Sequence, residues 1–262
     1  MAIRVVELTE AGSHHELTAL YATVWGTDAA TQLIDSGLLR ALAYTGNYVA
    51  GAYVGAEMVG GTVAFHTENG GLHSHITGVL PNARGHGVGR ALKLHQREWA
   101  LRRNIGVIGW TFDPLVRRNA YFNLHGLGAT ATAYLPDFYG AMSDDVNAGA
   151  PTDRLAVEWR LASPRVEQAC AGRADEPRRP AEAFLLVDRD GDEPVAAQHR
   201  WADGAVVLVA VPPDIESLRA RAPATAMLWR TLVREALVST VDNGYAITAM
   251  TRDGWYVLEA TR

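Results

Sequence analysis

The sequence predicts a mixed α+β fold, with a central, mostly antiparallel sheet flanked by helices and a smaller α+β extension after it. Short apolar runs with strand character alternate with longer runs whose apolar residues recur at helical spacing. Strand-like runs joined by tight turns indicate antiparallel hairpins. A segment rich in Ala, Pro, Arg and Glu reads as a connection. We therefore expect a first domain over residues 1–161, a linker over 162–182 and a C-terminal α+β subdomain over 183–262.

The first domain begins with a strand over residues 2–9 and a helix over 14–25, in which Leu17, Leu20, Tyr21 and Val24 follow helical spacing. The elements expected after it are a short helix near 37–43, a hairpin of 47–55 and 58–66, a strand at 72–80, a helix at 88–103 and a buried strand at 106–112. The sheet is expected to form from the strands of this series, with the helices on its faces.

The C-terminal subdomain shows the same mixture on a smaller scale. The elements expected in it are strands at 183–187 and 206–211, a helix at 225–241 and a hairpin of 245–251 and 255–261. About 80 residues form a small core, so we expect this subdomain to pack on the first domain or to extend its sheet.

Composition excludes several classes of protein. The 262 residues are 48% hydrophobic, which is enough for a large core. The 24 basic and 29 acidic residues give a net charge of −5, which argues against a nucleic acid as the main partner. No apolar stretch approaches ~18 residues, so no membrane span is expected. Without a signal-peptide pattern and with one cysteine, Cys170, the chain is expected in the cytoplasm, without an internal disulfide.

The most informative segment is VLPNARGHGVG, residues 79–89, which lies between an expected strand and an expected helix. Glycines let a backbone approach a ligand closely, and the amide groups at a helix N-terminus form an anion site. A nucleotide-binding protein is one interpretation. However, the spacing of Gly85, Gly87 and Gly89 fits neither the P-loop nor the dinucleotide-binding fingerprint.

This segment resembles the acyl-CoA signature of the GNAT acyltransferases, [RQ]-x-x-G-x-[GA], through Arg84, Gly87 and Gly89, with a preceding V-x-P at Val79 and Pro81. The expected order of elements over residues 2–161 is also similar to that of a GNAT domain. The resemblance implies acetyl-CoA or succinyl-CoA as the acyl donor. It implies backbone contacts to the pantetheine arm from Val79, Leu80 and Pro81, and contacts to the pyrophosphate from Arg84, Gly85, His86, Gly87, Val88, Gly89 and Arg90. It also suggests that the C-terminal subdomain is a degenerate half-copy of this layout.

Catalysis by such an enzyme needs a group that takes a proton from an ammonium nucleophile. His73 and His75 lie two residues apart on one expected strand and hence on one face of it. His75 is our first choice of base and Asp113 our second, while a purely structural role for His75 stays open. The H-x-H spacing also suits a metal, but no third ligand has a readable spacing, so we expect none.

Many GNAT enzymes carry a Tyr four residues before a Gly, which protonates the leaving thiolate, and an Asn that bonds pantetheine. Here the position four residues before Gly128 is Leu124, so the usual acid is missing. Tyr121 is the nearest phenol. Asn119 and Asn123, four residues apart on an expected helix, are candidates to bond the CoA arm.

Longer stretches occupy residues 72–101, 110–115 (WTFDPL), 119–129 (NAYFNLHGLGA), 139–140 and 151–159 (PTDRLAVEW). They resemble a largely uncharacterised branch of the superfamily in which some members accompany N-acylamino-acid racemases and are thought to N-succinylate amino acids. The resemblance implies a small-molecule amine, plausibly an amino acid, as the acceptor. Cations that a succinyl carboxylate would need are Lys93, Arg97, Arg117, Arg118 and Arg154. The alternative is a non-catalytic acyl-CoA-binding or scaffold protein. A monomer and a homodimer both stay open.

Overall fold

The computed structural model describes residues 2–27, 33–140, 151–197 and 201–261. The chain divides into two compact units, the first of which runs through Trp110 while the second begins at Thr111. The segment 162–182, expected as a linker, lies inside the second unit and contains helix α5 (Pro164–Cys170). The sequence signals of this helix are Ser163, whose hydroxyl accepts from the amide of Val166, and Pro164 in the first turn.

The first unit is built on a mixed sheet whose strands follow one another in chain order. These strands are β1 (Arg4–Glu7), β2 (Tyr48–Val54), β3 (Glu57–His66), β4 (Leu72–Val79) and β5 (Val107–Phe112). Neighbouring strands from β1 to β4 pair antiparallel, while β4 and β5 are parallel. The expected mixed, mostly antiparallel sheet is therefore confirmed. The chain passes from the first unit to the second within β5.

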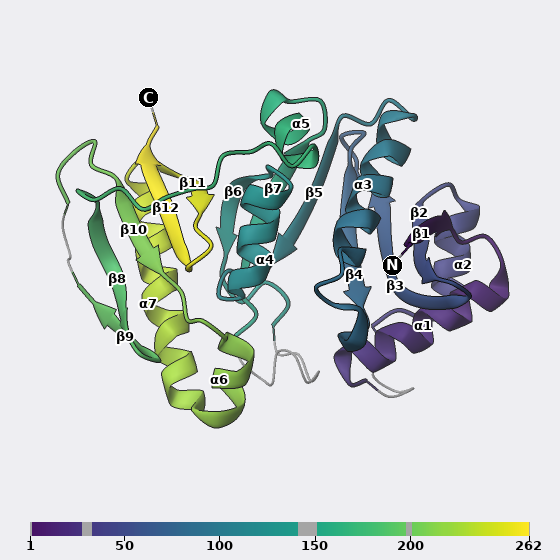
Figure 1. Cartoon of the computed structure of the whole chain (residues 1–262), viewed down its shortest axis with the longest axis horizontal. Helices are drawn as coiled ribbons and strands as arrows, with labels where there is room; N and C mark the ends of the chain where they lie inside the picture. The colour runs from purple at the N-terminus through teal and green to yellow at the C-terminus, as the bar shows by residue number, and fades with distance from the viewer. Residues whose placement is uncertain (1, 28–32, 141–150, 198–200, 262) are drawn as a thin grey trace. The chain divides into compact units, whose positions relative to one another are not determined.

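Helices cover both faces of this sheet (Figure 1): α1 (Ala11–Trp25) and α2 (Ser36–Tyr44), and α3 (Val88–Leu101). Consecutive residues of a strand point to opposite faces. A Cβ added at Gly61 would meet the side chain of Leu17 on α1, and one added at Gly60 would meet Val88 on α3. These glycines therefore let α1 and α3 approach β3 closely from opposite sides.

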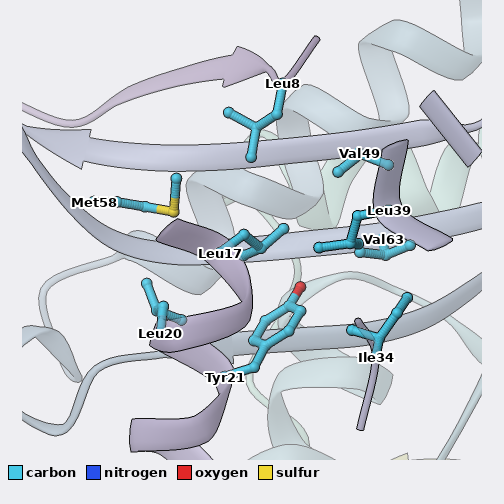
Figure 2. Packing of buried hydrophobic residues seen from close by; sticks show 9 residues of the cluster. All are labelled: Leu8, Leu17, Leu20, Tyr21, Ile34, Leu39, Val49, Met58 and Val63. Atoms are coloured by element: carbon cyan, nitrogen blue, oxygen red, sulfur yellow. The ribbon is translucent and has the colours of Figure 1, made fainter. Parts of the chain in front are cut away.

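The main core of the first unit lies between α1, α2 and the sheet. Its buried members are Leu8, Leu17, Leu20, Tyr21, Ile34, Leu39, Val49, Met58 and Val63 (Figure 2). A second cluster lies under α3 and includes Val88 and Leu92. Each fully buried aliphatic side chain contributes about 1.5–3 kcal/mol to folding. Leu17, Leu20 and Tyr21, which the sequence placed at helical spacing on α1, are all members of this core.

The second unit contains a β6–β7 hairpin, a second mixed sheet and further helices. Its first elements are α4 (Arg117–Tyr121), a π-helical turn (Phe122–Gly126), β6 (Thr130–Leu135) and β7 (Arg154–Arg160). After α5 come β8 (Phe184–Asp190), β9 (Glu193–Ala196), β10 (Val207–Ala210), α6 (Ile215–Arg221), α7 (Pro223–Asp242), β11 (Tyr245–Met250) and β12 (Trp255–Ala260). The second sheet has the order β11-β12-β10-β8-β9 (Figure 1).

The C-terminal part differs from the expectation around residues 188–193. The expected strand at 183–187 continues to Asp190 as β8, and β9, which begins at Glu193, was not expected from the sequence. Only Asp192 and Gly191, with φ of +59°, connect the two strands. The expected hairpin at the C-terminal end is confirmed as β11 and β12, which pair antiparallel. Within the described ranges, no helix is both long enough and apolar enough to cross a membrane.

Candidate functional site

The glycine-rich turn connects β4 to α3 through a short 3-10 turn at Pro81–Ala83. Gly85 and Gly87 have φ values of +79° and +84°, a left-handed backbone conformation that residues other than glycine rarely adopt. A Cβ added at either position would have no atom within 4 Å, so the turn presents open space beside its backbone. Gly89 has an ordinary φ and lies in the first turn of α3. The turn thus combines an exposed backbone with a helix N-terminus.

Backbone amides in this turn point to no partner in the described part of the chain. The N–H groups of residues 85–89 donate to no carbonyl, whereas the amide of Ala91 donates to the Gly87 carbonyl at 2.9 Å and closes the first turn of α3. Amides at a helix N-terminus carry a partial positive charge that favours a phosphate group. The geometry fits a pyrophosphate held by the amides of residues 85–89 at the N-terminus of α3.

Some backbone groups of Val79, Leu80 and Pro81, the residues expected to contact pantetheine, already have hydrogen-bond partners within the chain. Arg84, an exposed residue, donates from Nε to the carbonyl of Val79 at 3.3 Å. The amide of Leu80 donates to the carbonyl of Val59 at 2.9 Å, so it pairs with β3. Pro81 has no amide donor. Contacts of this segment with a ligand would therefore use the other groups of the strand end.

The pairing between β4 and β5 stops early. Their parallel ladder contains only the pairs Leu72–Ile108 and His73–Gly109, although β4 continues to Val79. We call the end of this ladder the fork; Ser74 and Trp110 are the first residues beyond it. A strand whose ladder ends while it continues offers backbone groups for other partners.

Both candidate histidines lie at the fork. Between β3 and β4 the register shifts from Val63–Ile76 to Ala64–Ser74, so His75 is the extra residue of a β-bulge. The rings of His73 and His75 lie 6.2 Å apart, and both pack against Phe65, at 5.2 Å and 5.7 Å between ring centroids. A bulge re-aims side chains and often lies beside an active site. His75 is exposed and His73 half-buried, so His75 is the more accessible base.

Both imidazoles are held toward their neutral form. Burial, together with the neighbouring His75 and Lys93, lowers the pKa of His73 from its ordinary value of 6.5. His75 is the more exposed ring, but the part of it that packs against the protein is shielded from water, and this partial burial lowers its pKa as well. A neutral imidazole accepts a proton, so near neutral pH both rings have the protonation state that a general base requires.

Beneath the strand, on the face opposite the two imidazoles, lies a buried lysine. Lys93 on α3 donates to the hydroxyl of Ser74 at 2.9 Å and lies 3.9 Å from the centroid of the Trp110 ring. Burial lowers the pKa of Lys93 to about 7. We expected Lys93 as a cation for an acyl carboxylate, but its side chain is buried beneath β4. The sequence signal for this burial is Ser74. Because it lies between His73 and His75 on a strand, its side chain points to the opposite, buried face of β4, where a polar partner such as Lys93 is needed.

Four of the predicted site residues lie in the second unit, and Asp113 is one of them. Its carboxylate accepts two hydrogen bonds from Arg230, at 2.8 Å and 2.9 Å, and also accepts from Arg219. Burial alone would raise its pKa, but Arg230, Arg219 and the amide of Leu115 hold the pKa of Asp113 well below its ordinary range. A carboxylate so strongly held as an anion is a poor proton acceptor. This geometry indicates a structural ion pair and weighs against Asp113 as the base.

The segment around Tyr121 also differs from the expected regular helix. The Tyr121 hydroxyl donates to Glu176 at 2.7 Å, and burial, followed by this bond, raises the pKa of the phenol. The α-helical turn ends at Tyr121 and π-helical geometry follows. Asn119 is exposed whereas Asn123 is buried, because the wider π turn changes the direction of later side chains. The two asparagines therefore do not form the single exposed face that we expected. Leu124 is buried and supplies no acid.

Cations expected for a succinyl carboxylate are also engaged in the second unit. Arg118 pairs with Glu216, and one of its two bonds measures 2.8 Å. Arg154 donates to the carbonyl of Asp153 and lies over the Tyr139 ring. For metal binding, no cluster of three or more His, Cys, Asp or Glu side chains with suitable geometry occurs among the residues with described positions.

Comparison with known proteins agrees with this arrangement. Residues 13–126 match the model of the Acetyltransferase (GNAT) family. The chain is similar in structure to yncA, a candidate acetyltransferase from Salmonella typhimurium solved with its cofactor acetyl-CoA. The TM-score is 0.51 at 18% identity, covering 63% of this chain and 98% of that chain.

A second similar structure is a candidate acetyltransferase from Acinetobacter baylyi. It has a TM-score of 0.50 at 15% identity, and the match covers 62% of this chain and 94% of that chain. No curated protein matches the sequence of this chain. At these identities the two structures establish the fold, which is the GNAT fold that the order of elements had implied. The match to the family model spans residues 13–126, which include most of helix α1, the glycine turn and both candidate histidines.

Proposed function

We propose that this chain, whose residues 13–126 match the model of the GNAT acetyltransferase family, is an enzyme that transfers an acyl group from acyl-CoA to the primary amine of a small molecule. The observation that carries this proposal is the glycine turn: residues 85–89 offer amides without a backbone partner at the N-terminus of α3, within the segment that matches the family model. These amides would hold the pyrophosphate, with Arg84, His86 and Arg90 beside them.

When bound, acyl-CoA supplies the thioester whose acyl group is transferred. The residues of the chain position the donor and manage one proton. Val79, Leu80 and Pro81, where β4 ends and the turn begins, would align the pantetheine arm along the strand beyond the fork. His75 would accept the proton that the amine loses as its nitrogen forms the new bond to the acyl carbon, and the carbon–sulfur bond breaks. A thiol pKa of about 8.5 makes the thiolate a good leaving group without a dedicated acid.

His73 supports His75 in this scheme. The two rings pack on Phe65, which restricts their rotation. His73 is the less exposed of the pair, so we assign it to orienting His75 through their common packing on Phe65. Tyr121, Asn119 and Asn123 remain candidates for thiolate protonation and for contacts to the CoA arm.

The identities of the acyl group and of the acceptor belong to the proposal as well. We propose acetyl or succinyl as the acyl group and an amino acid as the acceptor, because whole segments resemble a branch in which some members are thought to N-succinylate amino acids. A succinyl carboxylate would need a cation, and Arg97, one turn from Lys93 on α3, is the half-buried candidate in the first unit.

The rival function is a non-catalytic acyl-CoA-binding protein, which the absence of a Tyr at position 124 favours. The test incubates the full chain with acetyl-CoA or succinyl-CoA and a panel of amino acids and other amines, and follows free thiol release. We expect release that depends on both the amine and the enzyme. Thermal stabilisation by CoA esters without turnover on any amine would support the binding protein. Stabilisation by ATP or NAD alone would contradict both.

A further inference from the structure

Lys93 is the only lysine of the chain. All the other residues among its 24 lysines and arginines are arginines. A guanidinium stays charged at any accessible pH, whereas an ammonium is compact and loses its proton readily when buried. Lys93 is the one basic side chain of α3 that is buried, at 5% exposure. The choice of lysine at this position therefore has a chemical consequence that arginine would not reproduce.

The contacts of Lys93 converge on the fork. Its Nζ lies 2.9 Å from Ser74 Oγ and 3.4 Å from Gln96 Oε1, and 3.9 Å from the centroid of the Trp110 ring. Ser74 and Trp110 are the first residues beyond the β4–β5 ladder, one on each strand. Among residues with described positions, no carboxylate pairs with Lys93. The amine therefore interacts with a hydroxyl, an amide oxygen and an aromatic face.

We propose that Lys93 is a positioning residue, whose amine ties Ser74 of β4 to Trp110 of β5 at the fork and so fixes the bulged His75. The inference rests on the proposed function for its catalytic consequence, though not for its structural one.

The connection from Lys93 to His75 runs through one peptide unit. Ser74 is buried at 4% exposure, and it precedes His75 directly. Beyond the fork the β4–β5 ladder no longer fixes this backbone, and the bulge interrupts the regular pairing to β3. The hydrogen bond from Lys93 and the cation–π contact to Trp110 replace that constraint. A base must be held close to its productive geometry, so small shifts of His75 would reduce the rate strongly.

The charge of Lys93 acts on His73 as well. The influences on the pKa of His73 are burial, His75 and Lys93, all of which lower it, whereas burial alone lowers the pKa of Lys93, to about 7. His73 titrates below its ordinary 6.5, a range in which Lys93 is still mainly protonated. Lys93 therefore carries its positive charge over the pH range in which His73 titrates, and this charge favours the neutral form of the His73 imidazole.

The first test follows the ring signals of His73 and His75 by NMR in the full chain as the pH changes. The variants are Lys93→Met and the control Arg102→Met, which removes an exposed cation at the end of the same helix. In Lys93→Met we expect the pKa of His73 to rise by about half a pH unit or more. We expect Arg102→Met to leave it unchanged. An unchanged His73 titration in Lys93→Met overturns the electrostatic part of the inference.

The second test separates positioning from stability. Ser74→Ala keeps the Lys93 charge but removes its hydrogen-bond partner, and it serves if Lys93→Met fails to fold. Both variants should lower kcat about tenfold or more, with the KM for acyl-CoA changed less than about twofold. Only Lys93→Met should move the His73 titration. Unchanged kcat in both folded variants overturns the positioning role. Absence of turnover in the wild-type chain counts against the proposed function. The positioning role is then decided by the His75 ring signals, which should shift in both folded variants and not in Arg102→Met; unshifted signals overturn it.

Discussion

The imidazole rings of His73 and His75 lie 6.2 Å apart on the same side of β4, although a β-bulge interrupts the strand at His75. Alternation along a regular strand would give the same face, and Phe65 packs against both rings. The pair lies directly at and beyond the last residues that link β4 to β5. Two neutral imidazoles at a point where a sheet opens are the arrangement on which the proposed chemistry depends.

Replacing His75 with Gln should lower kcat/KM for the amine by about 100-fold or more, because a positioned base contributes that much to proton transfer. His73→Gln should cause a smaller loss, since His73 orients rather than accepts. His15→Gln, which changes an exposed histidine of α1, is the matched control and should have no effect. Steady-state kinetics with one acyl-CoA and one amine measures all three. Full activity in His75→Gln would show that its ring only packs against Phe65.

The rate should also depend on pH in a defined direction. Burial lowers the pKa of His75 below 6.5, so its basic form predominates above that pH and is lost as the pH falls through the lowered value. We expect kcat/KM for an amine to show an acidic limb with a midpoint below 6.5. The limb should disappear in His75→Gln. A midpoint clearly above 6.5, or the same limb in the variant, would assign the titration to another group.

Gly87→Glu should weaken CoA binding more than about tenfold, because the new side chain brings a negative charge to amides that would hold phosphate. Gly55→Glu is a close control: Gly55 also has a positive φ, +60° against +84° at Gly87, and open space for a Cβ. Both substitutions impose a similar backbone cost of about 1–2 kcal/mol. Calorimetric titration with CoA compares them. If Gly87→Glu binds CoA as tightly as Gly55→Glu, the pyrophosphate does not bind at this turn.

The stability of the chain should reflect the buried amine of Lys93. Burial lowers its pKa from 10.5 to about 7, so between these pH values the folded state binds fewer protons than the unfolded state. Unfolding free energy therefore rises with pH in this window, and the burial penalty is largest below pH 7. Lys93→Met removes this term, which is on the order of 5 kcal/mol at its largest. Urea titrations at several pH values should show wild type and variant converging toward alkaline pH, and parallel curves would contradict it.

Much of the first unit could be predicted because its signals are local. The glycines of the turn, the apolar spacing of α1 and the alternation along β4 each act through neighbouring residues, and the structure retains all three. The left-handed φ of Gly85 and Gly87 explains why glycine stands there, whereas Gly89 adopts a conformation open to other residues.

Features set by distant residues could not be predicted. Asp113 read as a candidate base, but Arg230 and Arg219, more than a hundred positions later in the sequence, hold its carboxylate. The bulge at His75 depends on the register of β3 against β4, which no single segment encodes. Helix α5 was missed because its cap and proline lie in a segment whose composition resembles a linker.

The proposed function requires that the chain acylate an amine at the expense of acyl-CoA. Mass spectrometry of a reaction containing the full chain, acetyl-CoA or succinyl-CoA and an amino-acid panel tests it directly, with His75→Gln as the comparison. We predict an N-acylated product formed in equal amount to free CoA, and a loss of product in the variant. Thioester that stays intact with every amine, although the chain binds CoA, would contradict it.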